Sequence, residues 1–572
     1  MKMQIELNNR KLEAESGETI LSVAKRAGIN IPTLCYLEHL KPAGRCRICV
    51  VEVDGRKDLV PSCSFPVSDG MKIHTHSPRV LEARKNLIEL MLANHPDDCL
   101  YCNRNSNCDL RQLADQLGVR ERELVHVEPH FEIDNSSPSL VRDPNKCILC
   151  GKCVRVCEEI QGVAAIELLG RGFESFVGVE NNKNLATSRC INCGQCILAC
   201  PTGALTEKSQ IQDVIDALND PEKYVVVQHA PAISVTLAEE FGVEAGIDVD
   251  GAMVAALRRM GFDKVFDTSF TADLTIMEEG SELVSRIVNG GKLPMLTSCS
   301  PGWIKFVEQF YPDFTGNLST CKSPQQMMGA IIKRIFAQRE DIDPAKIFSV
   351  SIMPCTAKKF EAGRPEMGEN GIQDVDVVLT TRELGRLLRM YGIDIRNIEP
   401  EQADSPFGER TTAGKIFGAT GGVMEAALRT GYYLVTGELM EHLEITPVRG
   451  LDGIKESKIK VGDLELGVAV ASSLSKARIL LDEVKKGRSD LHFIEVMTCP
   501  GGCVAGGGQP IGTNVDKIKA RSQALYKLDD SETMRMSHEN PSVKKLYEDY
   551  LGKPLSEKSH HLLHTHYEKR PI

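Results

Sequence analysis

The chain has 572 residues, of which 42% are apolar, 26% charged and 5% aromatic, and this length predicts several globular domains. A net charge of −11 with scattered Lys and Arg residues argues against nucleic acid as the main partner. The sequence has neither an apolar run long enough for a membrane span nor an apolar signal segment at its start. We therefore expect a cytoplasmic protein whose twenty cysteines are kept reduced.

Residues 1–78 are predicted to form a β-grasp ferredoxin-like domain. Met3–Leu7 and Lys11–Ala14 form a predicted hairpin, and Thr19 caps a helix that stops at Gly28. Four cysteines follow at C-x10-C-x2-C-x13-C, close to the plant-type [2Fe–2S] pattern although the first gap is longer. A zinc site in a ubiquitin-like fold is the weaker alternative. The candidate ligands are Cys35, Cys46, Cys49 and Cys63.

Residues 79–125 contain one histidine and three cysteines at H-x3-C-x2-C-x5-C. This spacing suits structural zinc and a [4Fe–4S] cluster equally well. The neighbouring cluster motifs favour iron–sulfur, because a zinc ion would leave a gap in an electron path. The candidate ligands are His95, Cys99, Cys102 and Cys108. The polar segment 126–140 is predicted to be a linker.

Residues 138–209 carry two matched C-x2-C-x2-C-x3-C runs, the second ending in Pro201. Such a pair is typical of ferredoxins with two [4Fe–4S] clusters, in which the fourth cysteine of each run binds the other cluster. Two such runs argue against structural zinc and against disulfide pairing. The candidate ligands are Cys147, Cys150, Cys153, Cys157, Cys190, Cys193, Cys196 and Cys200.

Residues 210–572 are predicted to be α/β, with short apolar strands followed by amphipathic helices. The predicted strands are Tyr224–Val227, Lys264–Phe266, Leu293–Leu296, Phe348–Met353, Val375–Leu379, Gly467–Ala471 and His492–Met497. Cys299, Cys355 and Cys499 each follow one of these strands, and Cys503 lies four residues past Cys499. Because the carboxyl ends of parallel strands meet at one crevice, we expect a further cluster site there.

Three segments of this region carry a family resemblance. They are TSCSPGW at 297–303, MPCTAKKFE at 353–361, and EVMTCPGGC at 495–503 followed by GGGQ at 506–509. In this order they resemble the signatures of [FeFe]-hydrogenases, and the similarity extends over the four-cluster front end of the large clostridial-type enzymes. The resemblance implies a multidomain α/β and α+β protein: a β-grasp [2Fe–2S] domain, a cluster domain with one histidine and three cysteine ligands, a bacterial-type 2[4Fe–4S] ferredoxin domain and a two-lobed α/β H-cluster domain.

The resemblance also implies an H-cluster, a [4Fe–4S] cubane joined through Cys503 to a di-iron unit with CO, cyanide and a bridging dithiolate. Cys355 and Cys499 would bind the cubane, and Lys358 would donate a hydrogen bond to a cyanide. The remaining pocket residues implied by the resemblance are Met353, Met497, Phe417, Pro231, Ala230 and Gln325. One [2Fe–2S] and three accessory [4Fe–4S] clusters would relay electrons.

Protons need their own route to a buried site. In the family a thiol beside the cluster starts a relay that matches Cys299, Glu279, Ser319, Glu282 and Arg286 here. A solvated acidic helix is the alternative interpretation of the glutamates. Relatives usually have a second cysteine where this chain has Ser300. Either Ser300 binds the cubane as an alkoxide and Cys299 carries protons, or Cys299 becomes the ligand and a hydroxyl replaces the proton-carrying thiol.

The resemblance implies reversible conversion of two protons and two electrons to H2, with ferredoxin or NAD(P)-linked flavoprotein subunits as electron partners. The alternative is a low-turnover hydrogen sensor or an electron-transfer iron–sulfur subunit of an NAD(P)-linked complex. The glycine-rich segment 418–422 lacks the Lys-Ser/Thr of a phosphate loop. We expect Cys321 to be a buried structural thiol. His560, His561, His564 and His566 are expected at an exposed helix end rather than in a metal site.

Overall fold

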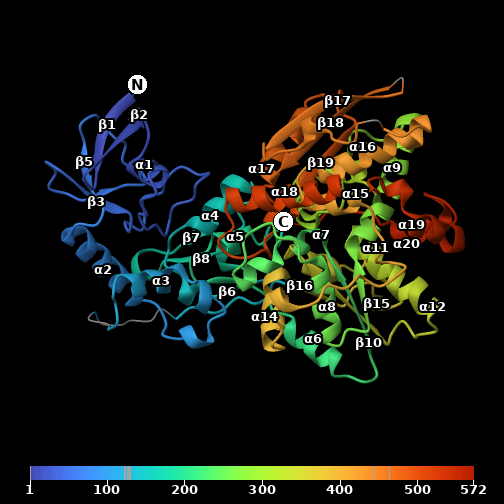
Figure 1. The fold of residues 1–572 in the computed structure, drawn as a ribbon, viewed down its shortest axis with the longest axis horizontal. Helices are drawn as coiled ribbons and strands as arrows, with labels where there is room; N and C mark the ends of the chain where they lie inside the picture. Colours follow the sequence, from blue (N-terminus) through green and yellow to red (C-terminus); the bar gives the residue numbers. More distant parts are fainter. Residues whose placement is uncertain (1, 122–123, 125–129, 441, 463, 572) are drawn as a thin grey trace.

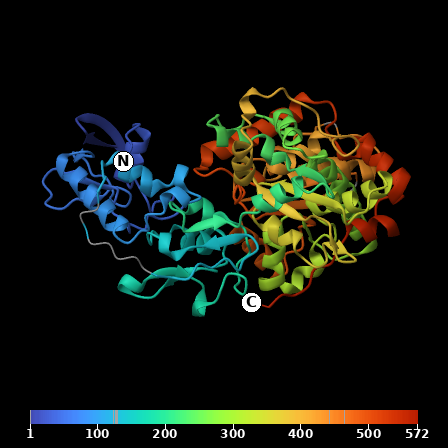
Figure 2. The same cartoon turned by 90° about the horizontal axis from the view of Figure 1, so that it is seen from below.

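The computed structural model describes the chain except residues 1, 122–123, 125–129, 441, 463 and 572. A smaller N-terminal part and a larger rounded part are joined by the ferredoxin-like region (Figures 1 and 2). Of the predicted linker 126–140, residues 126–129 lie outside the described residues. Among the residues described, no helix combines the length and apolar character that a membrane crossing requires.

The N-terminal sheet has the strand order β2-β1-β5-β3-β4, which confirms the predicted β-grasp-like arrangement. Asn8 and Asn9 have positive φ values of 49° and 65°, as a tight two-residue hairpin turn requires. The Thr19 hydroxyl accepts the Ser22 N–H and caps the helix, as predicted. The elements are β1 (Lys2–Leu7), β2 (Arg10–Glu15), α1 (Ile20–Arg26), β3 (Val50–Val53), β4 (Val60–Pro61) and β5 (Lys72–His74).

The next region consists of short elements around cysteine loops. In the ferredoxin-like part each cysteine run continues into a helix that begins after a left-handed glycine, Gly151 (φ 75°) or Gly194 (φ 70°). β6 pairs with β9, and β7 with β8. The elements are α2 (Pro78–Leu92), α3 (Asp109–Gln116), β6 (Leu140–Arg142), α4 (Lys152–Arg155), β7 (Glu167–Leu169), β8 (Phe176–Gly178), α5 (Gln195–Ala199) and β9 (Leu205–Glu207).

The larger part has two four-stranded sheets. The first, β11-β10-β13-β16, is parallel throughout, and the second, β12-β19-β18-β17, is parallel except for its edge strand β17. All seven strands predicted here are present, whereas β17 was missed because its exposed positions are mostly charged. The strands are β10 (Tyr224–His229), β11 (Lys264–Asp267), β12 (Met295–Leu296), β13 (Ile347–Met353), β16 (Val377–Thr380), β17 (Ile454–Val461), β18 (Leu464–Ser472) and β19 (Phe493–Met497).

Helices surround these two sheets (Figure 1). The buried helix α9 (Thr268–Asn289) packs against α16 (Gly422–Thr436) and α11 (Pro324–Ile331). The other α-helices are α6 (Ile211–Leu218), α7 (Pro231–Ser234), α8 (Asp250–Arg259), α10 (Pro301–Phe310), α12 (Ala337–Arg339), α13 (Ala357–Ala362), α14 (Thr381–Met390), α15 (Thr412–Lys415), α17 (Leu474–Lys485), α18 (Val515–Ser531), α19 (Pro541–Leu546) and α20 (Glu557–Leu563). A short hairpin joins β14 (Gly368–Glu369) and β15 (Ile372–Gln373).

The glycine-rich segment 418–422 leads into α16, and an internal carboxylate caps this helix. Glu495, on β19, accepts hydrogen bonds of 2.7 Å from the Gly421 and Met424 N–H groups. A Cβ on Gly422 would lie 1.8 Å from the Ile416 carbonyl oxygen, so close backbone packing requires this glycine. The segment therefore joins the second sheet to α16 and leaves this helix N-terminus filled by the chain itself.

Candidate active site

The eight cysteines of the two ferredoxin runs gather in two groups of four. One cavity is lined by Cys147, Cys150, Cys153 and Cys200, and a second by Cys157, Cys190, Cys193 and Cys196. Each group therefore combines three cysteines of one run with the fourth cysteine of the other. This exchange of the last cysteine is the arrangement that two-cluster ferredoxins use.

The remaining N-terminal candidates also lie close together. The thiols of Cys35 and Cys46 shift each other's pKa in opposite directions, and those of Cys49 and Cys63 do the same, so each pair lies close together. All four are buried. In the next region burial and the charge of Cys102 raise the pKa of both Cys99 and Cys108, so the three cysteines lie near one another. His95 is buried there, with Nδ1 3.1 Å from the Pro96 carbonyl oxygen.

These groups approach one another and lead into the larger part of the molecule. Cys35, Cys46, Cys108 and Cys150 share one buried cluster. A Cβ on Gly203 would lie 2.6 Å from Cys102 Sγ, which brings the histidine-containing group to the same ferredoxin loop. The charge of Cys499, just after β19, adds to burial in raising the pKa of Cys193, so these two cysteines also lie near each other. The candidate ligands thus form a continuous series that ends at the crevice.

Close backbone packing brings the ferredoxin loop around Cys193 against the signature segments of the larger part. A Cβ on Gly507 would lie 2.1 Å from the Cys193 carbonyl oxygen, and one on Gly194 would lie 2.4 Å from Thr356 Oγ1. The Thr356 hydroxyl donates to the Asn192 carbonyl oxygen at 2.7 Å, and the Gln195 amide donates to the Ala505 carbonyl oxygen at 2.9 Å. Glycines and side-chain hydrogen bonds together hold the ferredoxin loop against two of the three signature segments.

A cavity of about 80 Å³ lies where the strand ends meet. Every pocket residue predicted from the resemblance lines it, with three of the signature cysteines. The residues are Ala230, Pro231, Gln325, Met353, Phe417 and Met497 together with Cys299, Cys355 and Cys503. Cys499 lies beside this cavity, since the charges of Cys355 and Cys503 add to burial in raising the pKa of its thiol. Thiols and thioethers in an apolar wall suit a soft metal group.

Cys299 and Ser300 point to different surroundings. Cys299 lines the cavity, and burial, followed by the charge of Glu279, raises the pKa of its thiol. The Ser300 hydroxyl instead lies 2.8 Å from the hydroxyl of Thr498, the residue before Cys499. Sequence reasoning missed Thr498, although it lies next to a signature cysteine.

Lys358 presents its ammonium group to the same cavity. Nζ donates to the Cys299 carbonyl oxygen at 3.2 Å, to the Ser323 hydroxyl at 2.7 Å and to the Glu361 carboxylate at 2.7 Å. Gln325 also reaches Glu361, at 3.1 Å. Glu361 thus holds both polar side chains in place at the cavity wall.

Four of the five predicted relay residues are linked by hydrogen bonds, and Cys299 interacts electrostatically with the first of them, Glu279. Burial, together with the neighbouring Glu282 carboxylate, raises the pKa of Glu279 to about 8, against the opposing hydrogen bond from Ser319. The Ser319 hydroxyl donates to Glu282 at 3.0 Å, and Arg286 pairs with Glu282 at 2.6 Å. Glu279 and Glu282 are 2% and 8% exposed, so a solvated acidic helix is the wrong interpretation of this pair.

The structure corrects one of the predictions about the C-terminal histidines. His560, His561 and His566 are exposed, as expected for a surface helix end, but His564 is only 5% exposed. Its ring lies between Thr320 and Glu278, at 2.8 Å and 3.1 Å. The chain turns inward after α20 and pairs with the segment around Cys321. Cys321 is fully buried, as predicted.

Grouped cysteines that lead to a soft, buried cavity beside a chain of acids define an iron–sulfur oxidoreductase. Five family models match the chain: the C-terminal domain of the iron-only hydrogenase large subunit at 223–507, the iron hydrogenase small subunit at 515–570, a 2Fe–2S binding domain at 1–78, the NADH-ubiquinone oxidoreductase-G iron–sulfur region at 84–123 and a 4Fe–4S dicluster domain at 146–204.

Two curated hydrogenases are similar to this chain over nearly its whole length. The chain is 49% identical to the NADP-reducing hydrogenase subunit HndD of Solidesulfovibrio fructosivorans, over 99% of both chains, and 41% identical to iron hydrogenase 1 of Clostridium pasteurianum, over 98% and 99%. An [FeFe]-hydrogenase HydA1 structure from Chlamydomonas reinhardtii matches with a TM-score of 0.58 and 41% identity, covering 64% of this chain and all of that one. The chain belongs to the [FeFe]-hydrogenase family. It is an iron hydrogenase with N-terminal iron–sulfur domains and uses protons and H2 as substrates.

Proposed function

We propose that the cavity holds an H-cluster bound through Cys355, Cys499 and Cys503. The donor set supports this, because thiols and the thioethers of Met353 and Met497 are soft, and the Lys358 ammonium group places a positive charge at the cavity wall that suits an anionic ligand. When bound, such a group supplies an open iron position and a basic bridging amine for splitting or forming H2. The protein excludes water, holds the cluster and moves protons and electrons.

Ser300 is the proposed fourth cubane contact, and Cys299 the thiol that exchanges protons with the bound group. Two observations support this division of roles. Cys299 lies on the cavity wall within electrostatic reach of Glu279, which suits a first proton carrier. Ser300 lies beside the Cys499 loop through its contact with Thr498, which suits a ligand position on the cubane.

The proposed proton route runs from Cys299 through Glu279, Ser319 and Glu282 to Arg286. Because its pKa is raised to about 8, Glu279 is a neutral acid at pH 7 and can donate a proton toward Cys299. Ser319 then passes a proton from Glu282 to Glu279 through its hydroxyl. Arg286 orients Glu282 at the outer end.

The proposed electron route uses one [2Fe–2S] and three accessory [4Fe–4S] clusters. Cys35, Cys46, Cys49 and Cys63 would bind the first. His95 would bind the second through Nε2, with Cys99, Cys102 and Cys108. The two groups of four ferredoxin cysteines would bind the others. The close approach of Cys193 to Cys499 supports transfer from the last accessory cluster to the cavity.

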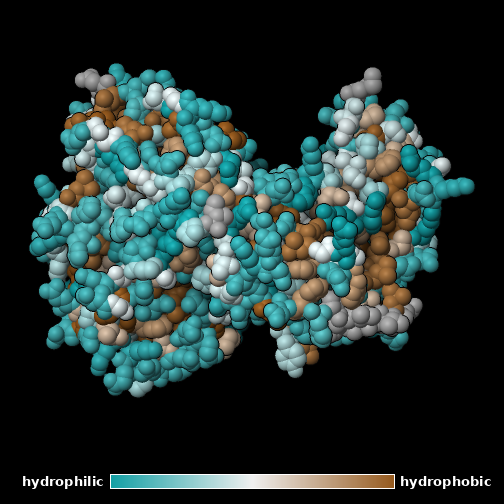
Figure 3. Space-filling model, turned by 180° about the vertical axis from the view of Figure 1, so that it is seen from behind, coloured by the Kyte–Doolittle hydropathy of each residue, from teal (hydrophilic) through white to brown (hydrophobic). Residues whose placement is uncertain are grey.

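An NAD(P)-linked complex or a ferredoxin is the proposed electron partner, in a cytoplasmic setting. The name of the Solidesulfovibrio relative supports the NADP link. Cys99 is exposed, and the adjoining Leu100 and Tyr101 are 86% and 89% exposed. Figure 3 shows further apolar residues on the surface of the smaller part of the molecule. Such a surface beside a cluster ligand suits a docking partner that exchanges electrons.

The single observation that carries the proposal is the convergence of Cys299, Cys355 and Cys503 on one cavity, with Cys499 beside it. Hydrogen evolution and uptake by the matured protein with methyl viologen test it directly. Activity in both directions is expected, and protein carrying the accessory clusters but no di-iron unit is the control. Equal rates from the two preparations would overturn the proposal.

A further inference from the structure

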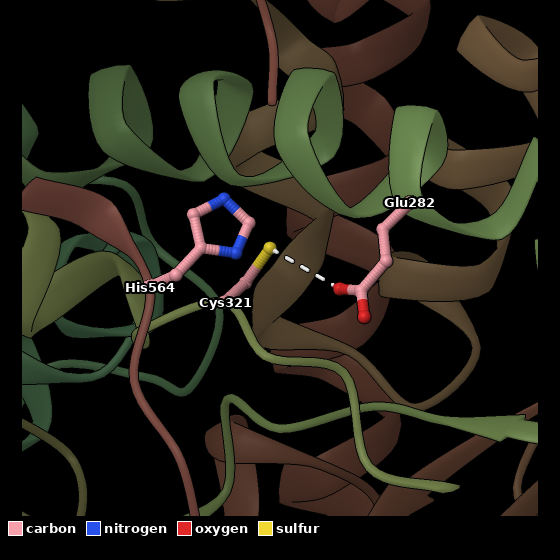
Figure 4. Close-up of side chains that lie close together, drawn as sticks. All are labelled: Glu282, Cys321 and His564. Atoms are coloured by element: carbon pink, nitrogen blue, oxygen red, sulfur yellow. Dashed lines mark hydrogen bonds between the residues drawn. The ribbon is translucent and has the colours of Figure 1, made fainter. Parts of the chain in front are cut away.

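Cys321 and His564 extend the acid chain in a second direction. The Cys321 thiol donates to Glu282 across 3.9 Å. The Cys321 sulfur, a nitrogen of His564 and an oxygen of Glu282 all lie within 4.8 Å of one another. Figure 4 shows the thiol between the imidazole and the carboxylate, with the three side chains coming from separate segments. Cys321 is therefore a further polar neighbour of Glu282, in addition to Ser319 and Arg286.

The backbone holds this arrangement firmly. The segments around Cys321 and His564 pair in an antiparallel bridge. The Lys322 N–H donates to the Leu563 carbonyl oxygen at 2.8 Å, and the Thr565 N–H donates to the Thr320 carbonyl oxygen at 2.7 Å. The C-terminal segment is thereby fixed along the outer end of the acid chain.

The three side chains of this cluster are arranged to transfer protons rather than to bind a metal ion. Burial would raise the pKa of Glu278, but hydrogen bonds from His564 and Tyr547 lower it, so Glu278 is a carboxylate that orients the imidazole. The other His564 nitrogen faces the Thr320 hydroxyl at 2.8 Å. Burial and the charge of Glu282 raise the pKa of Cys321, which keeps the thiol protonated. These hydrogen bonds leave no set of lone pairs for a cation.

The cluster reaches solvent through His560. Its ring stacks on that of His564, with centroids 4.5 Å apart and planes 5° apart. His560 is exposed on α20, whereas His564 is buried. Burial and the charge of His564 lower the pKa of His560, so at neutral pH it is a neutral base that can take up a proton.

We propose that Cys321, His564 and His560 form a second proton path between Glu282 and solvent. His560 takes up a proton, and because the stacked rings aim no N–H at each other's lone pairs, a water molecule at the ring edges carries the proton to His564. A second water molecule, or rotation of the His564 ring away from Thr320, spans the gap to Cys321. As the Cys321 S–H proton moves to the Glu282 carboxylate, the sulfur takes the proton of His564. One proton enters, both side chains return to their initial states, and H2 oxidation runs the path in reverse. This inference rests on the proposed relay from Cys299 to Glu282.

His560→Ala tests the outer end, with His561→Ala as the matched control. Both residues are exposed neighbours on α20, but His561 faces Glu369, at 3.6 Å, instead of His564. Because the Arg286 end remains, we expect His560→Ala to slow hydrogen evolution by about tenfold, less than the ~100-fold of a sole acid–base group. A larger solvent isotope effect and rescue by added imidazole should accompany it. His561→Ala should match the parent enzyme.

Cys321→Val and Cys321→Ser test the inner end without changing the surface. The valine variant fills the site but carries no exchangeable proton, so a loss similar to that of His560→Ala is expected. The serine variant should keep a faster rate and a smaller isotope effect than the valine variant. Rates for His560→Ala and Cys321→Val equal to that of His561→Ala would overturn the second path. Glu279→Gln, measured alongside, tests the shared inner relay, so failure of that relay is seen separately.

Discussion

The Ser300 and Thr498 hydroxyls lie 2.8 Å apart, one at the start of α10 and the other directly before Cys499. This contact directs Ser300 toward the proposed cubane loop, while Cys299 lies on the wall of the main cavity. The two adjacent residues are therefore positioned for different tasks. This positioning favours the proposed roles, in which the Cys299 thiol carries protons and the Ser300 hydroxyl binds the cluster.

Replacing these two residues separately should give opposite results. Cys299→Ala should abolish hydrogen turnover yet leave the cubane intact, because it removes only the first proton carrier. Ser300→Ala should reduce cubane content or shift its reduction potential, because a methyl group cannot bind iron. Iron analysis and electron paramagnetic resonance distinguish them. Loss of the cubane in Cys299→Ala, with retention in Ser300→Ala, would reverse the assignment.

Glu279→Gln should lower hydrogen evolution by about 100-fold or more, because the amide cannot pass a proton. In the parent enzyme the neutral Glu279 carboxyl donates a proton toward Cys299. This neutral form is lost as the pH rises through about 8, where Glu279 ionises. Hydrogen evolution should therefore fall above that pH, measured at constant driving force. An unchanged rate in Glu279→Gln would remove this residue from the route.

Gly507→Ala should weaken the joint between the ferredoxin loop and the catalytic part. The new Cβ would lie 2.1 Å from the Cys193 carbonyl oxygen, so the backbone must move, at a cost of about 2–4 kcal/mol in the free energy of unfolding. Gly431→Ala is the control, since a Cβ there meets nothing within 4 Å. Thermal unfolding and the rate of cluster reoxidation by protons measure both effects. Equal behaviour of the two variants would contradict the close approach.

Charge placed beside Cys99 should disturb partner docking alone. Leu100→Asp with Tyr101→Asp should lower the rate with reduced ferredoxin by about tenfold, because both side chains are exposed apolar groups of the kind that bind partners. The rate with methyl viologen should stay unchanged. Leu439→Asp, at a 55% exposed residue of the catalytic part, is the control. A ferredoxin rate unaffected by the double variant would place docking elsewhere.

Local sequence patterns predicted much of this architecture. The cysteine spacing predicted which fourth cysteine joins which group, and the short apolar runs predicted the strands that carry Cys299, Cys355 and Cys499. The burial of His564 could not be predicted, because it depends on the C-terminal segment folding back onto Thr320 and Cys321. The Ser300–Thr498 contact was missed for a similar reason, since 198 residues separate its partners.

Infrared spectroscopy of the protein matured with its di-iron cofactor tests the central claim most directly. The account predicts absorption bands of iron-bound CO and cyanide that are lost when Cys503, the proposed bridge to the di-iron unit, is replaced by Ala. Accessory cluster signals should persist in that variant. Matured protein with a full set of accessory clusters but no CO or cyanide bands would contradict the proposal that this cavity holds an H-cluster.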